Sequence, residues 1–324
     1  MPAWTPDADM PSDEFTPANI LVATDLGPAG RAAVDLAIEL ACSLDARLHL
    51  LHVVDLTGEA PLPEHTDPAI APYLERLRAR LQKRTDDKAL VLEAERARCT
   101  LRGLSCEATL RDGRVWEGVL STANEHDADF VVVGPHAQGE VEAALGVLGE
   151  RLLGSTADRV VRHATQPVWV VPAREDQRAP SPLQALLVGI DFSPAADRAL
   201  ALAAGLVARA GATLHLGHVL PPPVVDLDAY GDDIEKLRTA LVRSTHARLE
   251  ELAARFPGVE TQVHVCDGTD DVQAQLAGLA RRVDASALVV GAHRRSALGH
   301  LVLGSTTERC LRRAVRPVLV VPEG

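Results

Sequence analysis

Short runs of apolar residues alternate along the chain with longer segments in which apolar positions recur every three or four residues. Ala185–Ile190 is a continuous apolar run, typical of a strand buried on both faces. Ser193 and Pro194 then mark the start of a helix that Gly211 ends. The same pattern predicts strands at 212–219, 259–265, 286–290 and 317–321, and helices at about 232–255, at 270–282 and from 305 onward. Five strands separated by helices predict a parallel, doubly wound α/β sheet, because parallel strands need crossover connections.

This order of segments occurs twice. The stretch "LLGSTADRVVRHATQPVWVVP" (152–172) and the stretch "VLGSTTERCLRRAVRPVLVVP" (302–322) are identical at 12 of 21 positions. Such self-similarity indicates a tandem repeat. We expect a mobile leader at 1–18, a first domain at 19–173, a linker at 174–182 and a second domain at 183–324. The last strands, 168–171 and 318–321, should pair within one chain, because unpaired apolar edges are a liability.

Composition narrows the class of protein. A formal charge of -12 argues against nucleic acid or an anionic membrane as a partner. No stretch of about 20 apolar residues appears, and the acidic, proline-rich start does not have the pattern of a signal peptide. The five cysteines are scattered without a C-x-x-C pair, which predicts reduced thiols in a cytoplasmic protein. His264 and Cys266 share a strand face but have no second ligand pair, so no metal site is expected.

The candidate chemistry lies where the first and fourth strands end. In doubly wound sheets, ligands bind beyond the carboxyl ends of the strands, where the strand order reverses. Asp191 could accept hydrogen bonds from a ribose or an adenine amino group, or could merely cap the following helix. Gly291 would allow a sharp turn and the close approach of a ligand. Gly304, Ser305 and Thr306 open a helix, whose free N–H groups favour a phosphate.

Together these residues describe a cradle for a mononucleotide. His293 follows Gly291 by two residues, and it is either structural or in contact with a ligand through its backbone. Val219 ends the second strand and is included among the candidate contacts. The corresponding candidates in the first copy are Asp25, Gly134, Gly154 and Ser155.

The sequence here resembles the universal stress protein family in its tandem two-domain form. Family members that bind ATP carry G-x2-G-x9-G-[ST] after the fourth strand and an aspartate at the end of the first. The second copy has Gly291 and then Gly304-Ser305 after the nine residues 295–303, but Arg294 replaces the second glycine. The resemblance implies two Rossmann-like (adenine nucleotide alpha hydrolase-like), five-stranded parallel sheets with strand order 3-2-1-4-5. It also implies ATP, ADP or AMP as ligand, with or without Mg²⁺.

The two copies differ in their loops. Arg294 could bind a phosphate through charge-assisted bonds, or could form a solvated pair with Arg295. In the first copy Ala137 replaces the second glycine, and sixteen residues (138–153) precede Gly154. That longer loop includes carboxylates that would repel a phosphate: Glu140, Glu142 and Glu150. We therefore expect at most one adenine nucleotide per chain, in the second copy.

Three functions are compatible with a tandem α/β protein that has one candidate nucleotide site. The first is a nucleotide-binding regulatory protein of the stress-response type. The second is a slow ATPase, and the third is a dimerising scaffold with vestigial sites, which could also form a homodimer of whole chains. No Walker lysine, G-x-S-x-G motif or evident general base accompanies Asp191, so catalysis should be absent or very slow.

Overall fold

The computed structural model describes residues 16–55, 71–134, 154–172, 181–220, 227–268, 270–293 and 303–323. Most of the expected leader and linker lies outside these residues, as do Arg294 and the three carboxylates of the long first-copy loop. The "first half" is used below for residues 19–172 and the "second half" for residues 183–323.

Each half alternates strands and helices in the predicted order. The first half contains β1 (Asn19–Ala23), α1 (Pro28–Leu44), β2 (Arg47–Val54), α2 (Ala71–Leu101), β3 (Cys106–Asp112), α3 (Val115–Glu125), β4 (Phe130–Val133), α4 (Ser155–His163) and β5 (Val168–Val170). The second half contains β6 (Ala185–Gly189), α5 (Pro194–Ala210), β7 (Thr213–Val219), α6 (Leu227–Ala254), β8 (Glu260–Cys266), α7 (Val272–Arg282), β9 (Ala287–Ala292), α8 (Ser305–Arg313) and β10 (Val318–Pro322).

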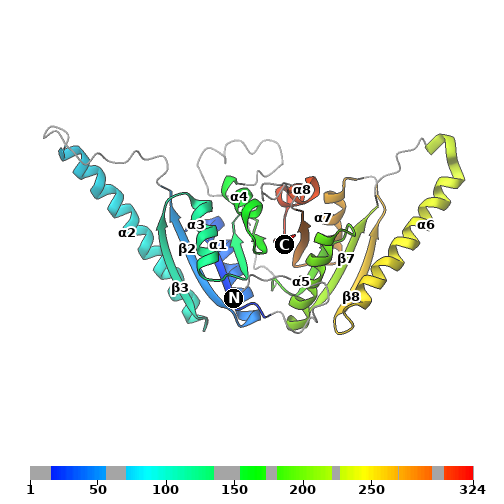
Figure 1. Ribbon diagram of the computed structural model, residues 1–324, viewed down its shortest axis with the longest axis horizontal. Coiled ribbons are helices and arrows are strands. Elements are labelled where there is room, and N and C mark those ends of the chain that lie inside the picture. Colours follow the sequence, from blue (N-terminus) through cyan, green and yellow to red (C-terminus); the bar gives the residue numbers. More distant parts are fainter. Residues whose placement is uncertain are drawn as a thin grey trace.

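All ten strands form one sheet in the order β3-β2-β1-β4-β5-β10-β9-β6-β7-β8 (Figure 1). Within each half the strands are parallel and follow the expected order 3-2-1-4-5. At the centre, β5 pairs antiparallel with β10, and Trp169 lies opposite Leu319. The predicted pairing of the last strands is thus present, and it joins the two five-stranded sheets into one.

Further contacts hold the two halves together beside this strand pair. The side chains of Trp169 and Leu319 are completely buried in an apolar layer that runs through both halves. The Arg209 guanidinium donates a hydrogen bond to the Leu44 carbonyl oxygen at 3.4 Å, and α1 packs against α5. Arg162 on α4 lies 3.7 Å from Glu308 on α8. The two halves are thus in contact through helices on both faces of the sheet, next to the central strand pair.

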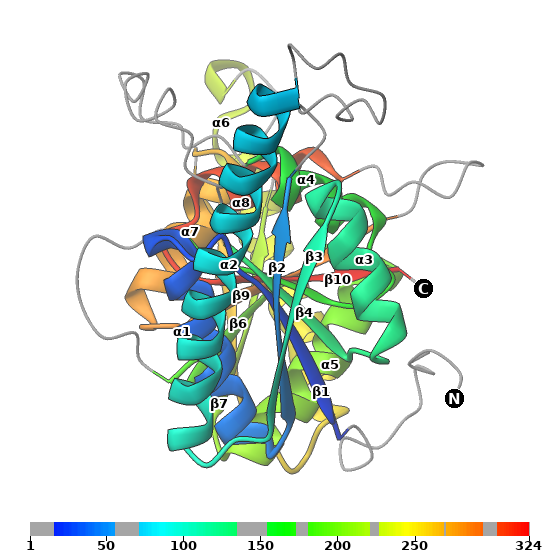
Figure 2. The same ribbon diagram turned by 90° about the vertical axis from the view of Figure 1, so that its left-hand side faces the viewer.

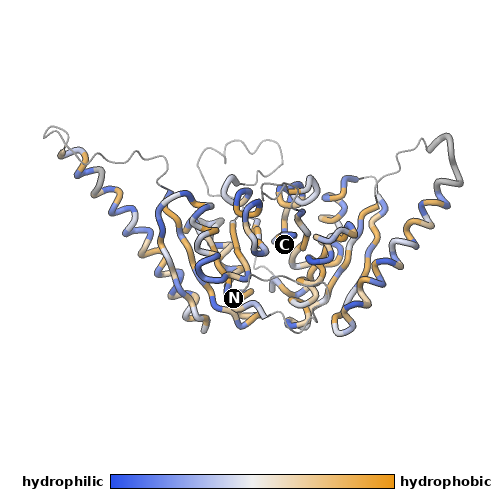
Figure 3. Tube along the Cα trace, viewed as in Figure 1, coloured by the Kyte–Doolittle hydropathy of each residue, from blue (hydrophilic) through white to orange (hydrophobic). Residues whose placement is uncertain are grey.

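Helices cover both faces of the sheet. In the first half, α1 and α2 lie on one face and α3 and α4 on the other (Figure 2). The long helices α2 and α6 lie at the two outer ends of the molecule, and their hydropathy alternates along their length (Figure 3). Among the described helices, none combines the length and the apolar character that crossing a bilayer requires.

Two predicted boundaries are corrected. Helix α6 begins at Leu227 rather than near residue 232, so it continues through Gly231 despite the low helix propensity of glycine. Strand β9 continues to Ala292, because Val321 and Pro322 of β10 pair with Gly291 and Ala292. The predicted limits of α5 are confirmed: the Ser193 hydroxyl caps its start, and Gly211 ends it with a φ of 61°.

Candidate functional site

The switch point of the second half lies between β6 and β9. These strands are parallel neighbours, with Gly189 opposite Val290, while β7 and β10 flank them on the two outer sides. Asp191 follows β6 and Gly291 lies near the end of β9, so the fold brings both to the same edge of the sheet. The equivalent edge of the first half holds Asp25 after β1 and Gly134 after β4.

The side chain of Asp191 points into solvent, with 65% of its surface exposed. One carboxylate oxygen accepts a hydrogen bond from the Ser193 backbone N–H at 3.0 Å. The start of α5 is capped instead by the Ser193 hydroxyl, which accepts from the Ala196 N–H at 3.2 Å. Asp191 therefore does not cap the helix, and its exposed carboxylate keeps acceptor capacity that a ligand could use.

Asp25 is half-buried and makes one contact that Asp191 also makes and one that it does not. Its Oδ1 atom accepts hydrogen bonds from the backbone N–H groups of Gly27 at 2.8 Å and Gly30 at 3.1 Å. Gly27 is the N-cap residue of α1 and has no side chain to cap with, so the Asp25 carboxylate caps the helix in its place. The capping interpretation thus applies to Asp25 and not to Asp191.

One residue in α1 and α5 accounts for this difference. A Cβ at Gly30 would lie 2.3 Å from the Asp25 Oδ1 atom, so only glycine leaves room for the carboxylate there. Position 196 in the second half, which aligns with position 30, holds alanine. The Ala196 methyl group excludes an aspartate from the capping position, and the Asp191 side chain points outward.

The prediction of a sharp turn at Gly291 is wrong. Gly291 lies inside β9, paired with Val321, and its φ is not in the left-handed region. A Cβ at this position would lie 2.4 Å from the carbonyl carbon of Ala195 and 2.8 Å from the Ala196 nitrogen. Glycine is therefore required by the close packing of α5 on the sheet. The Thr307 hydroxyl also donates a hydrogen bond to the Gly291 carbonyl oxygen at 3.1 Å, which fixes α8 to this strand.

Helix α8 presents its N-terminus next to this edge. Gly304 is the N-cap residue with φ -59° and ψ 145°, values that any residue can adopt, and no side chain caps the helix. A Cβ added to Gly304 would meet no atom within 4 Å. Ser305 and Thr306 are exposed. Among the residues that the structure describes, none caps the N–H groups at this helix start, and this arrangement suits an anion.

The first half has a nearly identical helix start. Gly154 is the N-cap residue of α4 with φ -60° and ψ 147°, and Ser155 is exposed. The two halves therefore differ at their aspartates rather than at these helix ends.

His293 lies between two carboxylates. Its Nε2 atom is 3.7 Å from Asp191 Oδ2, and its Nδ1 atom is 3.3 Å from Glu323 Oε2. The backbone N–H of Glu323 also bonds to the Ala292 carbonyl oxygen at 2.9 Å. The ring is thereby fixed beside Asp191, a contact that the sequence did not predict. Val219 is buried at the end of β7, on the other side of β6.

Phe192 was not predicted from the sequence to support the site. Its φ of 60° is unusual for a bulky residue, and Leu26 has the same conformation in the first half, at 62°. The Phe192 ring lies 4.9 Å from the His218 ring, and the Arg248 guanidinium lies 3.7 Å above its centroid. His218 in turn bonds to the Ile190 carbonyl oxygen at 2.7 Å. These contacts stabilise the turn that carries Asp191; no signal in the sequence marks them.

The doubly wound sheet and the aspartate at its switch point define a Rossmann-like α/β protein. The sequence profile described as "Universal stress protein family" matches residues 18–172 and, a second time, residues 182–322. The chain belongs to the universal stress protein family.

Individual proteins agree with this assignment. A universal stress protein of Mycolicibacterium smegmatis is 29% identical over 311 residues, which cover 94% of this chain and 97% of that protein. One from Mycobacterium tuberculosis is 33% identical over 198 residues, covering 60% of this chain and 62% of the relative. The crystal structure of a universal stress protein from Archaeoglobus fulgidus superposes with a TM-score of 0.63 at 22% identity, covering 96% and 100% of the two chains. That superposition extends the agreement to the fold of nearly the whole chain.

Proposed function

We propose that the second half binds one adenine nucleotide at the carboxyl ends of β6 and β9. The protein would then act as a nucleotide-dependent regulatory protein of the stress-response type. One observation carries the proposal: the Asp191 carboxylate is exposed at the switch point, because Ser193 caps α5 in its place. Its free oxygens suit the ribose hydroxyls or the adenine amino group.

The start of α8 suits the phosphates. Its backbone N–H groups, the exposed hydroxyls of Ser305 and Thr306, and the open space at Gly304 together form an anion site. Mg²⁺ would accompany a bound triphosphate. Family membership supports the proposal, since ATP-binding members carry the same glycine-serine pair at this position.

The first half does not receive a nucleotide in this proposal. Its aspartate is half-buried and caps α1 through the Gly30 N–H at 3.1 Å, a bond that has no counterpart at Asp191. We propose that this half serves as the partner of the second half through β5 and β10. All five cysteines are free thiols, which is consistent with a cytoplasmic location.

A scaffold without a nucleotide is the second candidate function. It is favoured by the central strand pair, which joins the halves without any ligand. Extraction of nucleotides from the purified, denatured protein, followed by chromatography, separates the two functions. Our proposal predicts an adenine nucleotide in amounts up to one per chain, and markedly less in Asp191→Ala than in Asp25→Ala. An empty extract, together with no uptake of added ATP or ADP, would favour the scaffold.

A further inference from the structure

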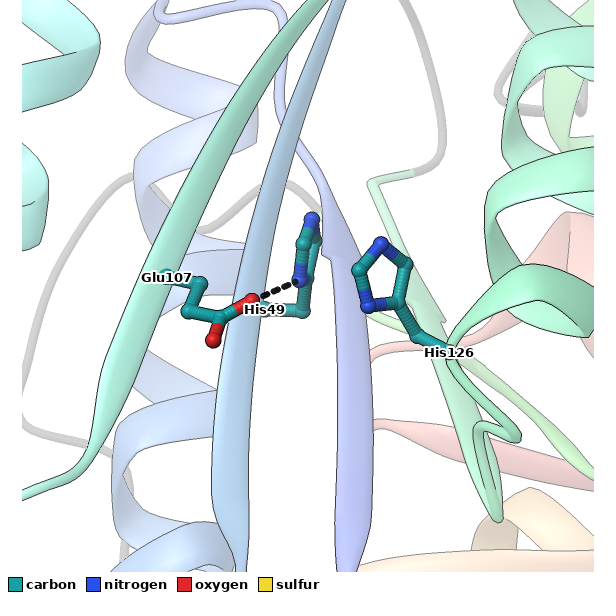
Figure 4. A group of neighbouring side chains, drawn as sticks. All are labelled: His49, Glu107 and His126. Atoms are coloured by element: carbon teal, nitrogen blue, oxygen red, sulfur yellow. Dashed lines mark ion pairs between the residues drawn. The ribbon is translucent and has the colours of Figure 1, made fainter.

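Three potential metal ligands from separate elements meet on one face of the sheet in the first half. His49 lies on β2, Glu107 lies opposite it on β3, and His126 is the C-cap residue of α3. One ligand atom from each residue lies within 4.8 Å of the other two. Figure 4 shows the His126 ring reaching from the end of α3 toward His49, with Glu107 beside it on the neighbouring strand.

His49 is oriented for ligation by a hydrogen bond on its other side. Its Nε2 atom lies 2.9 Å from the Thr109 hydroxyl oxygen, and its Nδ1 atom lies 3.6 Å from Glu107 Oε2. When Nε2–H donates to Thr109, Nδ1 presents its lone pair toward Glu107. Histidines that bind metals are commonly oriented in this way by a partner on the second ring nitrogen.

The charge around the cluster also suits a cation. Burial lowers the pKa of His49, and the neighbouring His126 lowers it further, which favours the neutral form of the ring that can bind a metal. The C-terminal end of α3, where His126 lies, carries a partial negative charge. Arg111 is the nearby cation, and Glu125 neutralises it in an ion pair.

The second half provides an internal comparison, because it keeps the strands but not the ligands. His215 corresponds to His49, and it lies opposite Gln262 where His49 has Glu107. The C-cap residue of α7 is Val283 where α3 has His126. The carboxylate and the imidazole at the helix end are thus particular to the first half, whereas the second half instead places His264 of β8 at 3.1 Å from His215.

We propose that His49, Glu107 and His126 bind a divalent transition-metal ion, with zinc as the best match. Two imidazoles and one carboxylate are a known zinc ligand set, which leaves a fourth position for water. Zinc–ligand distances of about 2.0–2.1 Å place tetrahedral ligands about 3.3 Å apart, so the three groups must draw together slightly. The exposed Glu107 side chain has the freedom to do so.

The cluster lies apart from the proposed nucleotide site. His49 and Glu107 are near the amino ends of β2 and β3, whereas the nucleotide site is at the carboxyl ends of β6 and β9. Zinc binding therefore does not depend on the proposed function and is measured without nucleotide.

The test is a Zn²⁺ titration of the chelator-stripped full chain by calorimetry. We expect one tightly bound zinc per chain. His126→Val and Glu107→Gln, which install the residues of the second half, should each weaken binding at least about tenfold. Co²⁺ in place of Zn²⁺ should give the visible absorption of a four-coordinate site in the parent protein and lose it in both variants. Both changed residues lie at the surface or at a helix end, so thermal melting of the metal-free variants should match the parent.

The matched control is His215→Gln, which removes the equivalent histidine of the second half and should leave zinc binding unchanged. Absence of a stoichiometric zinc in the parent would overturn the proposal. So would binding that persists in both first-half variants, or that is lost equally in His215→Gln, because the ion would then lie elsewhere. If a variant has altered melting, Thr109→Val takes its place, because this change leaves the three ligands intact. It should lower the affinity for Zn²⁺ about 10–100-fold, since the His49 ring loses the partner that orients it.

Discussion

The Asp25 carboxylate accepts a hydrogen bond from the Gly30 backbone N–H at 3.1 Å, inside the first turn of α1. That position is available only because residue 30 has no Cβ. Alanine at position 196 closes the same position in the second half, and Ser193 caps α5 there. Two aspartates at equivalent places in a repeat thus have different environments: Asp25 caps a helix, and Asp191 is exposed.

Asp25→Ala should destabilise the protein more than Asp191→Ala. The first change removes two hydrogen bonds, one of which caps α1, at a cost of about 1–2 kcal/mol in unfolding free energy. The second change removes one hydrogen bond of an exposed carboxylate and should cost under about 0.5 kcal/mol. Adding Gly27→Ser to Asp25→Ala should restore much of the loss, because it supplies the hydroxyl that Ser193 supplies to α5. Urea unfolding followed by circular dichroism measures all three, and equal stability of the two alanine variants would contradict the assignment.

Gly291→Ala should destabilise the protein strongly, although it adds only one methyl group. Its methyl group would lie 2.4 Å from the Ala195 carbonyl carbon, so α5 must move away from the sheet, at a cost of about 2 kcal/mol or more. Gly304→Ala is the control, because its methyl group enters open space and should cost under about 1 kcal/mol. Thermal melting compares the two, and a Gly291→Ala variant as stable as Gly304→Ala would show that the helix does not pack this closely.

Protonation of the neighbouring histidines His215 and His264 should lower the stability of the protein on mild acidification. Their rings lie 3.1 Å apart at the nearest nitrogens, and burial lowers the pKa of both. In the unfolded chain both histidines have a pKa of about 6.5, so on acidification they bind protons there before they do in the folded protein. The free energy of unfolding is therefore unaffected well above a pH of about 6.5, and it falls as the pH drops below that value toward the lower pKa values of the folded state. His264→Thr, which installs the hydroxyl partner that Thr109 gives His49, should reduce this loss between pH 7.5 and 5.5 by up to about 1 kcal/mol. Unfolding at both pH values measures it, and an unchanged pH dependence would exclude the pair as its source.

The strands, the helices and the central pairing follow from local patterns, which is why the sequence predicted them. Apolar runs mark β6 and β9, a serine and a glycine mark the ends of α5, and an unpaired apolar edge explains the contact between β5 and β10. The packing of Gly291 against Ala195 could not be predicted, because glycine at a strand end is equally typical of a turn.

The site was predicted less completely than the fold. Asp25 and Asp191 have the same place in the sequence of their repeats, so the sequence does not distinguish them. The residues that do, Gly30 and Ala196, come close to the aspartates only when the helix has formed and packed against the strand end. The cluster of His49 and His126 was missed for a related reason. The partner of His49 comes from the end of a helix 77 positions later (126 − 49), and no spacing along the chain links the two residues.

The measurement that most directly tests the asymmetry of the two halves is calorimetric titration of ATP, with Mg²⁺, into the parent chain, Asp191→Ala and Asp25→Ala. We predict at most one site per chain. Asp191→Ala should weaken binding by about 1–3 kcal/mol through lost hydrogen bonds, which is roughly 5- to 150-fold, while Asp25→Ala should leave affinity and stoichiometry nearly unchanged despite its lower stability. Two sites per chain, or a larger loss of affinity in Asp25→Ala than in Asp191→Ala, would contradict the account.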